Sequence, residues 1–135
     1  MISAGIDAGA ENIKVVIVED ERILSHSVIP VGRQRIREVV DAALREAIEK
    51  AGILASQIES AVGTGVGSNH ISSAHEKVSE ASCCACGVTW LLPSTDTAID
   101  MGADKCLVVR CEDGKILNTA RNDRCASGTG RFLKV

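Results

Sequence analysis

Two short stretches of the sequence place an aspartate and a glycine between apolar segments. The first is Asp7-Ala8-Gly9, followed by Lys14, and the second is Asp100-Met101-Gly102. In a tight turn, glycine lets the backbone approach an oxyanion, and the N–H groups of the turn point toward it. An aspartate beside such a turn can hold Mg²⁺ through water. Each stretch is therefore a candidate phosphate-binding turn, and a plain hairpin turn is the alternative.

The repetition of this pattern adds a catalytic possibility. If both turns contact one ligand, one acid can organise Mg²⁺ while the other positions an attacking water. A third glycine-rich stretch, Gly63-Thr64-Gly65-Val66-Gly67, lacks the Lys-Ser/Thr ending of a P-loop and is not a Walker motif. Its glycines suit a close approach to a ligand or a flexible connection, and the sequence alone favours neither.

Cys125 differs in its surroundings from the other cysteines of the chain. It precedes the small residues Ala126-Ser127-Gly128-Thr129-Gly130 and a predicted helix start. Exposed N–H groups and the dipole of that helix would stabilise a thiolate or an anionic iron–sulfur cluster there. A buried cysteine in a Gly-rich turn is the alternative, and the spacing alone favours it.

The stretch Cys83-Cys84-Ala85-Cys86 has the composition of a metal-binding motif. A second Cys or His pair at zinc-finger spacing is missing from the sequence, because His70 and His75 lie upstream in a different arrangement. We therefore expect these cysteines to be buried along a helix, and a small zinc or thiol protein is the weaker alternative. Cys106 and Cys111 fall in a predicted strand, as core or edge residues.

The spacing of apolar residues predicts the elements that position these groups. Three strands joined by tight turns indicate an antiparallel meander, at residues 3–6, 13–19 and 22–29. Apolar residues at helical spacing predict an amphipathic helix from Arg33 to Ala51, ended by Gly52. The remaining predicted elements are a strand at 58–64, a weaker helix at 72–86, strands at 98–101, 106–111 and 115–120, and a helix start at 131–135.

Composition and charge narrow the class of protein. The chain has 135 residues, of which 45% are apolar and 24% charged, and these are values of a globular domain. A net charge of −3 gives no basic surface for nucleic acid or an anionic membrane, and no apolar run is long enough to span a bilayer. The amino terminus lacks the pattern of a signal peptide. We therefore expect a cytoplasmic protein with reduced cysteines and no nucleic-acid or membrane partner.

In combination, four segments of the chain resemble one family closely. They are Gly5-Ile6-Asp7-Ala8-Gly9, Gly63-Thr64-Gly65, Ile99-Asp100-Met101-Gly102-Ala103 and Asn122-Asp123-Arg124-Cys125-Ala126-Ser127-Gly128-Thr129-Gly130-Arg131-Phe132. The family comprises the activators of 2-hydroxyacyl-CoA dehydratases and the ATP-binding subunits of benzoyl-CoA reductase. The resemblance spans nearly the whole chain, and the segment that begins at Cys125 is its most specific part.

The resemblance implies an α/β fold of the ribonuclease-H-like ATPase type, related to actin, sugar kinases and heat-shock chaperones. A mixed sheet with an antiparallel meander and flanking helices is expected. In this family two such lobes clamp ATP and Mg²⁺, and dimers or paired subunits share one [4Fe-4S] cluster. ATP hydrolysis drives a low-potential electron from that cluster to a partner, which is a 2-hydroxyacyl-CoA dehydratase or benzoyl-CoA reductase component.

The same resemblance implies roles for residues of this chain. Asp100 is the expected catalytic residue, and Cys125 is the expected cluster ligand. The expected cofactor-binding residues are Asp7, Gly9, Lys14, Gly63, Gly65, Gly102, Gly128 and Gly130. Residues 1–120 are expected to form the first lobe. Residues 121–135 are expected to form the cluster-cysteine loop and the start of a second lobe that is otherwise missing.

Differences from the family pattern open a second hypothesis. Ala10 and Glu11 replace small hydroxyl residues of the first turn, and Ala103 replaces a second glycine of the other turn. In these turns the chain is more similar to the reductase-type subunits than to the dehydratase activators. Glu11, Ala103 and the missing second lobe favour, as the alternative function, a catalytically inert module for nucleotide sensing or dimerisation.

Overall fold

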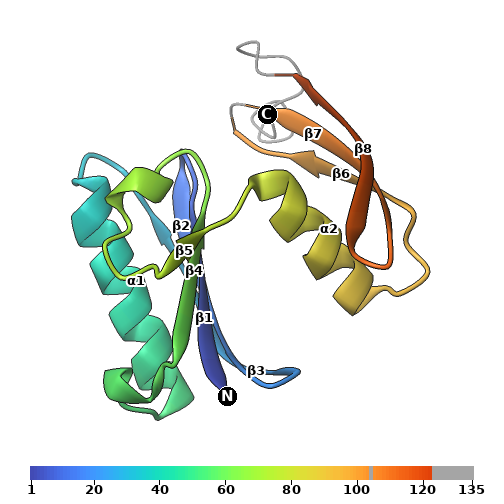
Figure 1. Ribbon diagram of the computed structural model, residues 1–135. Helices are drawn as coiled ribbons and strands as arrows, with labels where there is room; N and C mark the ends of the chain where they lie inside the picture. The colour runs from blue at the N-terminus through green and yellow to red at the C-terminus, as the bar shows by residue number, and fades with distance from the viewer. Residues whose placement is uncertain (104, 123–135) are drawn as a thin grey trace. The chain divides into compact units, whose positions relative to one another are not determined.

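The computed structural model describes residues 1–103 and 105–122 of the chain. The chain divides into two compact units, Met1–Val78 and Ser79–Val135, and each unit has its own sheet (Figure 1). The helix start predicted at residues 131–135 lies outside the described residues. The predicted lobe boundary between residues 120 and 121 stays a prediction.

The first unit is built on a five-stranded mixed sheet. Its strands, in the order β3-β2-β1-β4-β5, are β1 (Ile2–Ala8), β2 (Asn12–Glu19), β3 (Arg22–Pro30), β4 (Ser60–Thr64) and β5 (Glu76–Lys77). The first three strands are antiparallel neighbours, which confirms the predicted meander. β4 runs parallel to β1, and β5 runs parallel to β4. Because β1 is the central strand, other strands flank its carboxyl end on both sides.

Helix α1 (Ile36–Ala51) covers one face of this sheet (Figure 1). Two small residues of the helix, Ala43 and Ala47, are fully buried. They let the helix backbone approach β3 so closely that side chains of the strand reach it. Ser25 donates a hydrogen bond to the carbonyl oxygen of Ala47 at 2.6 Å, and Ser27 donates to that of Ala43 at 2.7 Å.

The ends of α1 follow from backbone geometry at two glycines. The helix begins at Ile36, later than the predicted Arg33, because the chain first turns at Gly32 with a φ of 57°. Gly52 ends the helix in the left-handed conformation with a φ of 68°, as predicted. Two short 3₁₀ helices lie before and after β4, η1 (Ala55–Gln57) and η2 (Ser68–His70).

The second unit combines one helix with a three-stranded antiparallel sheet. Its elements are α2 (Glu80–Leu91), β6 (Thr97–Met101), β7 (Cys106–Glu112) and β8 (Lys115–Asn122), and the strand order is β6-β7-β8. These strands confirm the predicted strand pair and the strand that follows it. Ala85 of α2 is buried together with three residues of β7, which are Leu107, Val109 and Cys111.

The helix predicted at residues 72–86 is wrong in its first half. The residues before Ser79 form β5 and its connections, and the N–H group of Val78 donates to the carbonyl oxygen of Gly63. Ser79 then caps α2 by accepting a hydrogen bond from the N–H group of Ser82 at 3.1 Å. Within the described part of the chain, no helix is long and apolar enough to cross a membrane.

The meander β6-β7-β8 repeats the backbone plan of the meander β1-β2-β3. In each first hairpin the glycine of the Asp-x-Gly turn donates its N–H to the carbonyl oxygen three residues later. The two bonds are Gly9 to Asn12 at 3.1 Å and Gly102 to Lys105 at 2.9 Å. This confirms on the backbone the repetition seen in the sequence.

The later parts of the two meanders also correspond. The pairing of the second hairpin shifts register after Ile17 in the first meander and after Arg110 in the second. The turns that follow contain Asp20 and Asp113, which have positive φ angles of 52° and 48°. All these features occur at the same sequence spacing from the initial aspartate, so each unit contains one copy of the same supersecondary structure.

The helices, however, pack on different faces of the two copies. In the first copy Ala8, which neighbours Asp7, is buried in the core formed with α1. In the second copy Leu107, the register partner of Asp100, is buried against α2. Because neighbouring residues of a strand point to opposite faces, Asp7 points away from the helix of its unit and Asp100 points toward it.

A larger residue at Ala43 should destabilise the first unit. We expect Ala43→Leu to reduce the free energy of unfolding by about 1–3 kcal/mol, since the helix backbone lies against β3 at this position. Ala42→Leu is the matched control, because Ala42 is exposed on the same turn of α1. Urea unfolding measures both variants, and equal stability of Ala43→Leu and Ala42→Leu would contradict this packing.

Candidate functional site

Three side chains form a row across the carboxyl end of the central strand. Asp7 of β1 is opposite Lys14 of β2 and opposite Thr64 of β4. Side chains at opposite positions of neighbouring strands lie on one face of the sheet. Ile6 and Ala8 are buried in the core on the α1 side, so the row lies on the other face.

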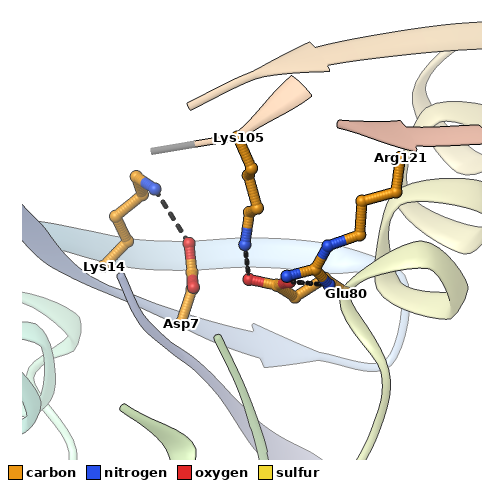
Figure 2. Close-up of polar contacts among 5 residues, drawn as sticks. All are labelled: Asp7, Lys14, Glu80, Lys105 and Arg121. Carbon is orange, nitrogen blue, oxygen red and sulfur yellow. Dashed lines mark hydrogen bonds and ion pairs between the residues drawn. The ribbon is translucent and has the colours of Figure 1, made fainter. Parts of the chain in front are cut away.

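Lys14 and Asp7 form an ion pair within this row. The Lys14 Nζ atom lies 2.8 Å from the Asp7 Oδ2 atom (Figure 2). The two side chains are 56% and 34% exposed, so water screens their attraction. Exposed pairs of this kind contribute only about 0–1 kcal/mol to stability. A cation or another ligand can therefore replace Lys14 at the carboxylate at little cost.

Gly65 lies directly against the Asp7 carboxylate. Its φ angle is +90°, and a Cβ atom at this position would lie 2.5 Å from the Asp7 Oδ1 atom and 2.5 Å from the Ala8 carbonyl oxygen. The N–H group of Gly67 donates to the same carbonyl oxygen at 2.9 Å. The glycines of residues 63–67 thus allow this loop to pack on the end of β1. This close packing accounts for the glycines, and a flexible connection is not needed to explain them.

Gly63 and Gly9 also have reasons for being glycine within the protein itself. A Cβ atom on Gly63 would lie 3.0 Å from the Ile71 Cδ1 atom, and one on Gly9 would lie 2.8 Å from the Asn12 carbonyl oxygen. The N–H group of Gly9 is used inside its turn by its bond to Asn12. A phosphate bound at this turn would therefore have to accept hydrogen bonds from N–H groups other than that of Gly9.

In the second unit, Asp100 is an exposed residue of β6 and Gly102 closes the turn after it. Lys105, at the other end of this turn, is 8% exposed. The Glu80 carboxylate, at the start of α2, accepts hydrogen bonds from Lys105 and from Arg121 of β8 (Figure 2). The charge of the buried lysine is therefore compensated, and the turn is anchored to α2.

This charged cluster was not predicted from the sequence. Glu80 and Arg121 are 41 residues apart, and neither belongs to a recognisable motif. Lys105 resembles Lys14 in sequence because each follows an Asp-x-Gly turn. The structure separates their roles, since Lys14 pairs with the aspartate of its own turn and Lys105 pairs with a residue of α2.

The burial expected for the cysteines of α2 is only partly correct. Cys83 and Cys84 are half-buried, whereas Cys86 is exposed and its thiol donates to the Gly114 carbonyl oxygen at 3.6 Å. Of the two cysteines of β7, Cys111 is buried and Cys106 half-buried. Among residues 1–103 and 105–122, no group of three His, Cys, Asp or Glu residues is placed to hold a metal ion.

The surroundings of Cys84 disfavour its ionisation. Burial raises the pKa of the Cys84 thiol, and the neighbouring Asp100, Cys111 and Cys83 raise this pKa further. A thiol must lose its proton to bind zinc or to act as a nucleophile. Cys84 is therefore better suited to packing between α2 and β7 than to the zinc chemistry considered for this segment.

The residues predicted to form the site are distributed between the two units. Asp7, Gly9, Lys14, Gly63 and Gly65 lie around the carboxyl end of β1 in the first unit. Asp100 and Gly102 lie at the corresponding turn of the second unit. The remaining predicted site residues, Cys125, Gly128 and Gly130, lie outside the described residues. All of these assignments stay predictions.

Comparisons with known proteins identify the family of the chain. Residues 4–135 match the model of the BadF/BadG/BcrA/BcrD ATPase family. The chain is 38% identical to the activator of lactoyl-CoA dehydratase from Anaerotignum propionicum, over 100% of this chain and 52% of that protein. It is 28% identical to a subunit of benzoyl-CoA reductase from Thauera aromatica, over 98% of this chain and 49% of that protein. The chain spans about half the length of these curated relatives.

Solved structures confirm the predicted fold class. Component A of (R)-2-hydroxyglutaryl-CoA dehydratase from Acidaminococcus fermentans is 32% identical, with a TM-score of 0.93 over 99% of this chain and 52% of that one. The activator of 2-hydroxyisocaproyl-CoA dehydratase from Clostridium difficile, with bound ADPNP, is 35% identical, with a TM-score of 0.88 over 99% of this chain and 50% of that one. A ROK hexokinase from Thermus thermophilus, with a TM-score of 0.62 and 16% identity over 95% of this chain and 50% of that one, shows the same fold.

A side chain at Gly65 should disrupt the packing of its loop on β1. We expect Gly65→Ala to lower the free energy of unfolding by about 2 kcal/mol or more, because the positive φ angle and the contact with the Ala8 carbonyl oxygen both disfavour alanine. Gly87→Ala in α2 is the control, since no atom outside the local helix lies within 4 Å of its Cβ position. This control should be neutral or slightly stabilising in thermal unfolding. Equal stability of Gly65→Ala and the unmodified protein would contradict the close contact between Gly65 and the carboxyl end of β1.

Proposed function

Because the chain belongs to the BadF/BadG/BcrA/BcrD ATPase family, we propose that it is part of an ATP-dependent electron-transfer activase. In this proposal ATP hydrolysis drives a low-potential electron from a [4Fe-4S] cluster to a dehydratase or reductase that acts on a CoA thioester. The observation that carries the proposal is the duplicated Asp-x-Gly turn, which places one acid at a strand end in each unit.

The first turn supplies groups that fit Mg²⁺ and phosphate. The Asp7 carboxylate is a hard oxygen ligand of the kind that Mg²⁺ prefers, and its exposed pairing with Lys14 is easily exchanged. Lys14 then remains beside the carboxylate as a positive charge for the nucleotide phosphates. The activator from Clostridium difficile, 35% identical to this chain, was determined with bound ADPNP, and this supports a nucleotide as the ligand.

The second turn supplies the other acid of the proposed reaction. If both turns contact one nucleotide, Asp7 would organise the metal and Asp100 would position the attacking water. The Gly102–Lys105 bond and the Glu80 carboxylate fix the turn that follows Asp100. A fixed turn limits where a neighbouring carboxylate can point, which is what positioning of a water molecule needs.

The cluster part of the proposal rests on Cys125 and its glycines Gly128 and Gly130. Iron–sulfur clusters are held by cysteine thiolates. A dimer or paired subunits would be needed to complete the ligand set, and the partner would be a 2-hydroxyacyl-CoA dehydratase or a benzoyl-CoA reductase component. The names of relatives support this choice, as one is an activator of lactoyl-CoA dehydratase and another is a subunit of benzoyl-CoA reductase.

A nucleotide-sensing or dimerisation module without catalysis is the second candidate function. Glu11 lies within the first turn, where a phosphate would approach. A carboxylate beside a phosphate is repelled unless a cation offsets the charge. Binding of Mg-ATP without turnover would favour a sensing module, and absence of any binding would leave dimerisation.

Removal of the Asp7 charge should abolish Mg-dependent nucleotide binding. We expect Mg-ATP to stabilise the unmodified protein against unfolding, by about 2.7 kcal/mol at a concentration one hundred times Kd. Asp7→Asn should lose most of this stabilisation while its ligand-free stability changes by less than about 1 kcal/mol. Asp41→Asn, at an exposed position of α1, is the control for loss of a charge. Equal stabilisation of Asp7→Asn and the control would count against the site.

Replacement of Cys125 should prevent cluster assembly. After anaerobic reconstitution of the full-length protein with iron and sulfide, we expect Cys125→Ala to lose the [4Fe-4S] absorption and electron paramagnetic resonance signals. Cys86→Ala, which removes an exposed cysteine of α2, should keep these signals. An unchanged spectrum in Cys125→Ala would refute the cluster assignment while leaving nucleotide binding intact.

A further inference from the structure

Thr64 has a hydroxyl group that the fold does not explain. It is the last residue of β4, and its Oγ1 atom is buried. Within the described part of the chain, this atom has no hydrogen-bond partner. A buried hydroxyl without a partner costs free energy, and valine would fill the same space without that cost. A threonine at this position therefore suggests a partner that the ligand-free protein does not provide.

The position of Thr64 indicates which group that partner is. The residue is the register partner of Asp7, and neighbouring strands are about 4.8 Å apart. Gly65, the next residue, would bring a Cβ atom within 2.5 Å of the Asp7 Oδ1 atom. The Asp7 carboxylate is thus a hydrogen-bond acceptor next to Thr64 on the same face of the sheet.

Asp7 lies between Lys14 and Thr64 in the row across the sheet. Lys14 is on β2 and Thr64 is on β4, so they flank Asp7 from opposite sides. The Asp7 Oδ2 atom is held by Lys14 at 2.8 Å. The other oxygen, Oδ1, lies on the side of Gly65, but in this orientation it accepts no hydrogen bond from the Thr64 hydroxyl. Once a metal ion competes with Lys14, the carboxylate is released from this orientation.

We propose that Thr64 is a positioning residue for Asp7. Its hydroxyl donates a hydrogen bond to the Asp7 carboxylate when that carboxylate leaves Lys14 to hold the hydrated Mg²⁺ of a bound nucleotide. The hydroxyl is unsatisfied before binding and satisfied after it, so its whole contribution favours the metal-bound state. This inference rests on the proposed function and assigns to Thr64 a part in it.

The test compares two substitutions that differ in the hydroxyl group. Thr64→Val keeps the shape of the side chain and removes the donor, whereas Thr64→Ser keeps the donor. Dissociation constants for ADPNP are measured by calorimetry with Mg²⁺ and with EDTA, and ligand-free stability is measured by urea unfolding. Ser73→Ala is the matched control, because the Ser73 Oγ atom is also buried without a partner within the described residues but lies outside the Asp7 row.

We expect Thr64→Val to raise the Kd for Mg-ADPNP about tenfold, the effect of one hydrogen bond to a charged group. Its ligand-free stability should equal or exceed that of the unmodified protein, and its binding in EDTA should be unchanged. Thr64→Ser and Ser73→Ala should bind Mg-ADPNP like the unmodified protein.

Two results would overturn the inference, and they differ from failure of the proposed function. If Thr64→Val bound Mg-ADPNP as tightly as the unmodified protein, the hydroxyl would have no role in binding while nucleotide binding itself stood. If Thr64→Val lost stability in the absence of ligand, the hydroxyl would be structural. Failure of the unmodified protein to bind Mg-ADPNP would instead refute the nucleotide site, and the role of Thr64 with it.

Discussion

The close packing of the 63–67 loop on the carboxyl end of β1 is the constraint on which the candidate site depends. Gly65 leaves no room for a side chain between itself, the Ala8 carbonyl oxygen and the Asp7 carboxylate. The loop therefore holds Asp7 from one side, while β2 supplies Lys14 from the other. A central β1 makes this possible, because only a strand with neighbours on both sides can present one acid to two elements.

The two Asp-x-Gly turns show how one backbone plan can serve different electrostatic purposes. Both turns close by the same hydrogen bond, from Gly9 to Asn12 and from Gly102 to Lys105. In the first unit the nearby lysine is exposed and pairs with the aspartate, which leaves an exchangeable contact. In the second unit Lys105 is buried against Glu80, and removal of one partner from a buried pair is strongly destabilising. The exposed pair at the first turn thus allows a ligand to replace Lys14, whereas the buried pair at the second turn holds Lys105 in place.

The opposite placement of the helices on the two meanders has a consequence for the aspartates. α1 covers the face away from Asp7, so the first aspartate is left beside groups that can accept a ligand. α2 packs on the face of Asp100, where the carboxylate neighbours Cys84 and raises the pKa of its thiol. The same motif is therefore placed in two chemical surroundings, which matches the different roles proposed for a metal-organising acid and a water-positioning acid.

The sequence by itself determined the strands other than β5, the helix α1, its end at Gly52, the repeated turns and the family. These features depend on local signals, which are apolar spacing, glycine conformation and short motifs, and each is readable within a few residues. Only the tertiary structure decided that Gly65 contacts the Asp7 carboxylate. It also decided that Lys14 pairs with Asp7 whereas Lys105 pairs with Glu80, and that Glu80 also pairs with Arg121. Apart from the Asp7–Lys14 pair, which joins two strands of one hairpin, these contacts join residues far apart in the chain, so no local pattern encodes them. The start of α2 was misjudged for the same reason, since the pairing of β5 with β4 competes with helix formation before Ser79.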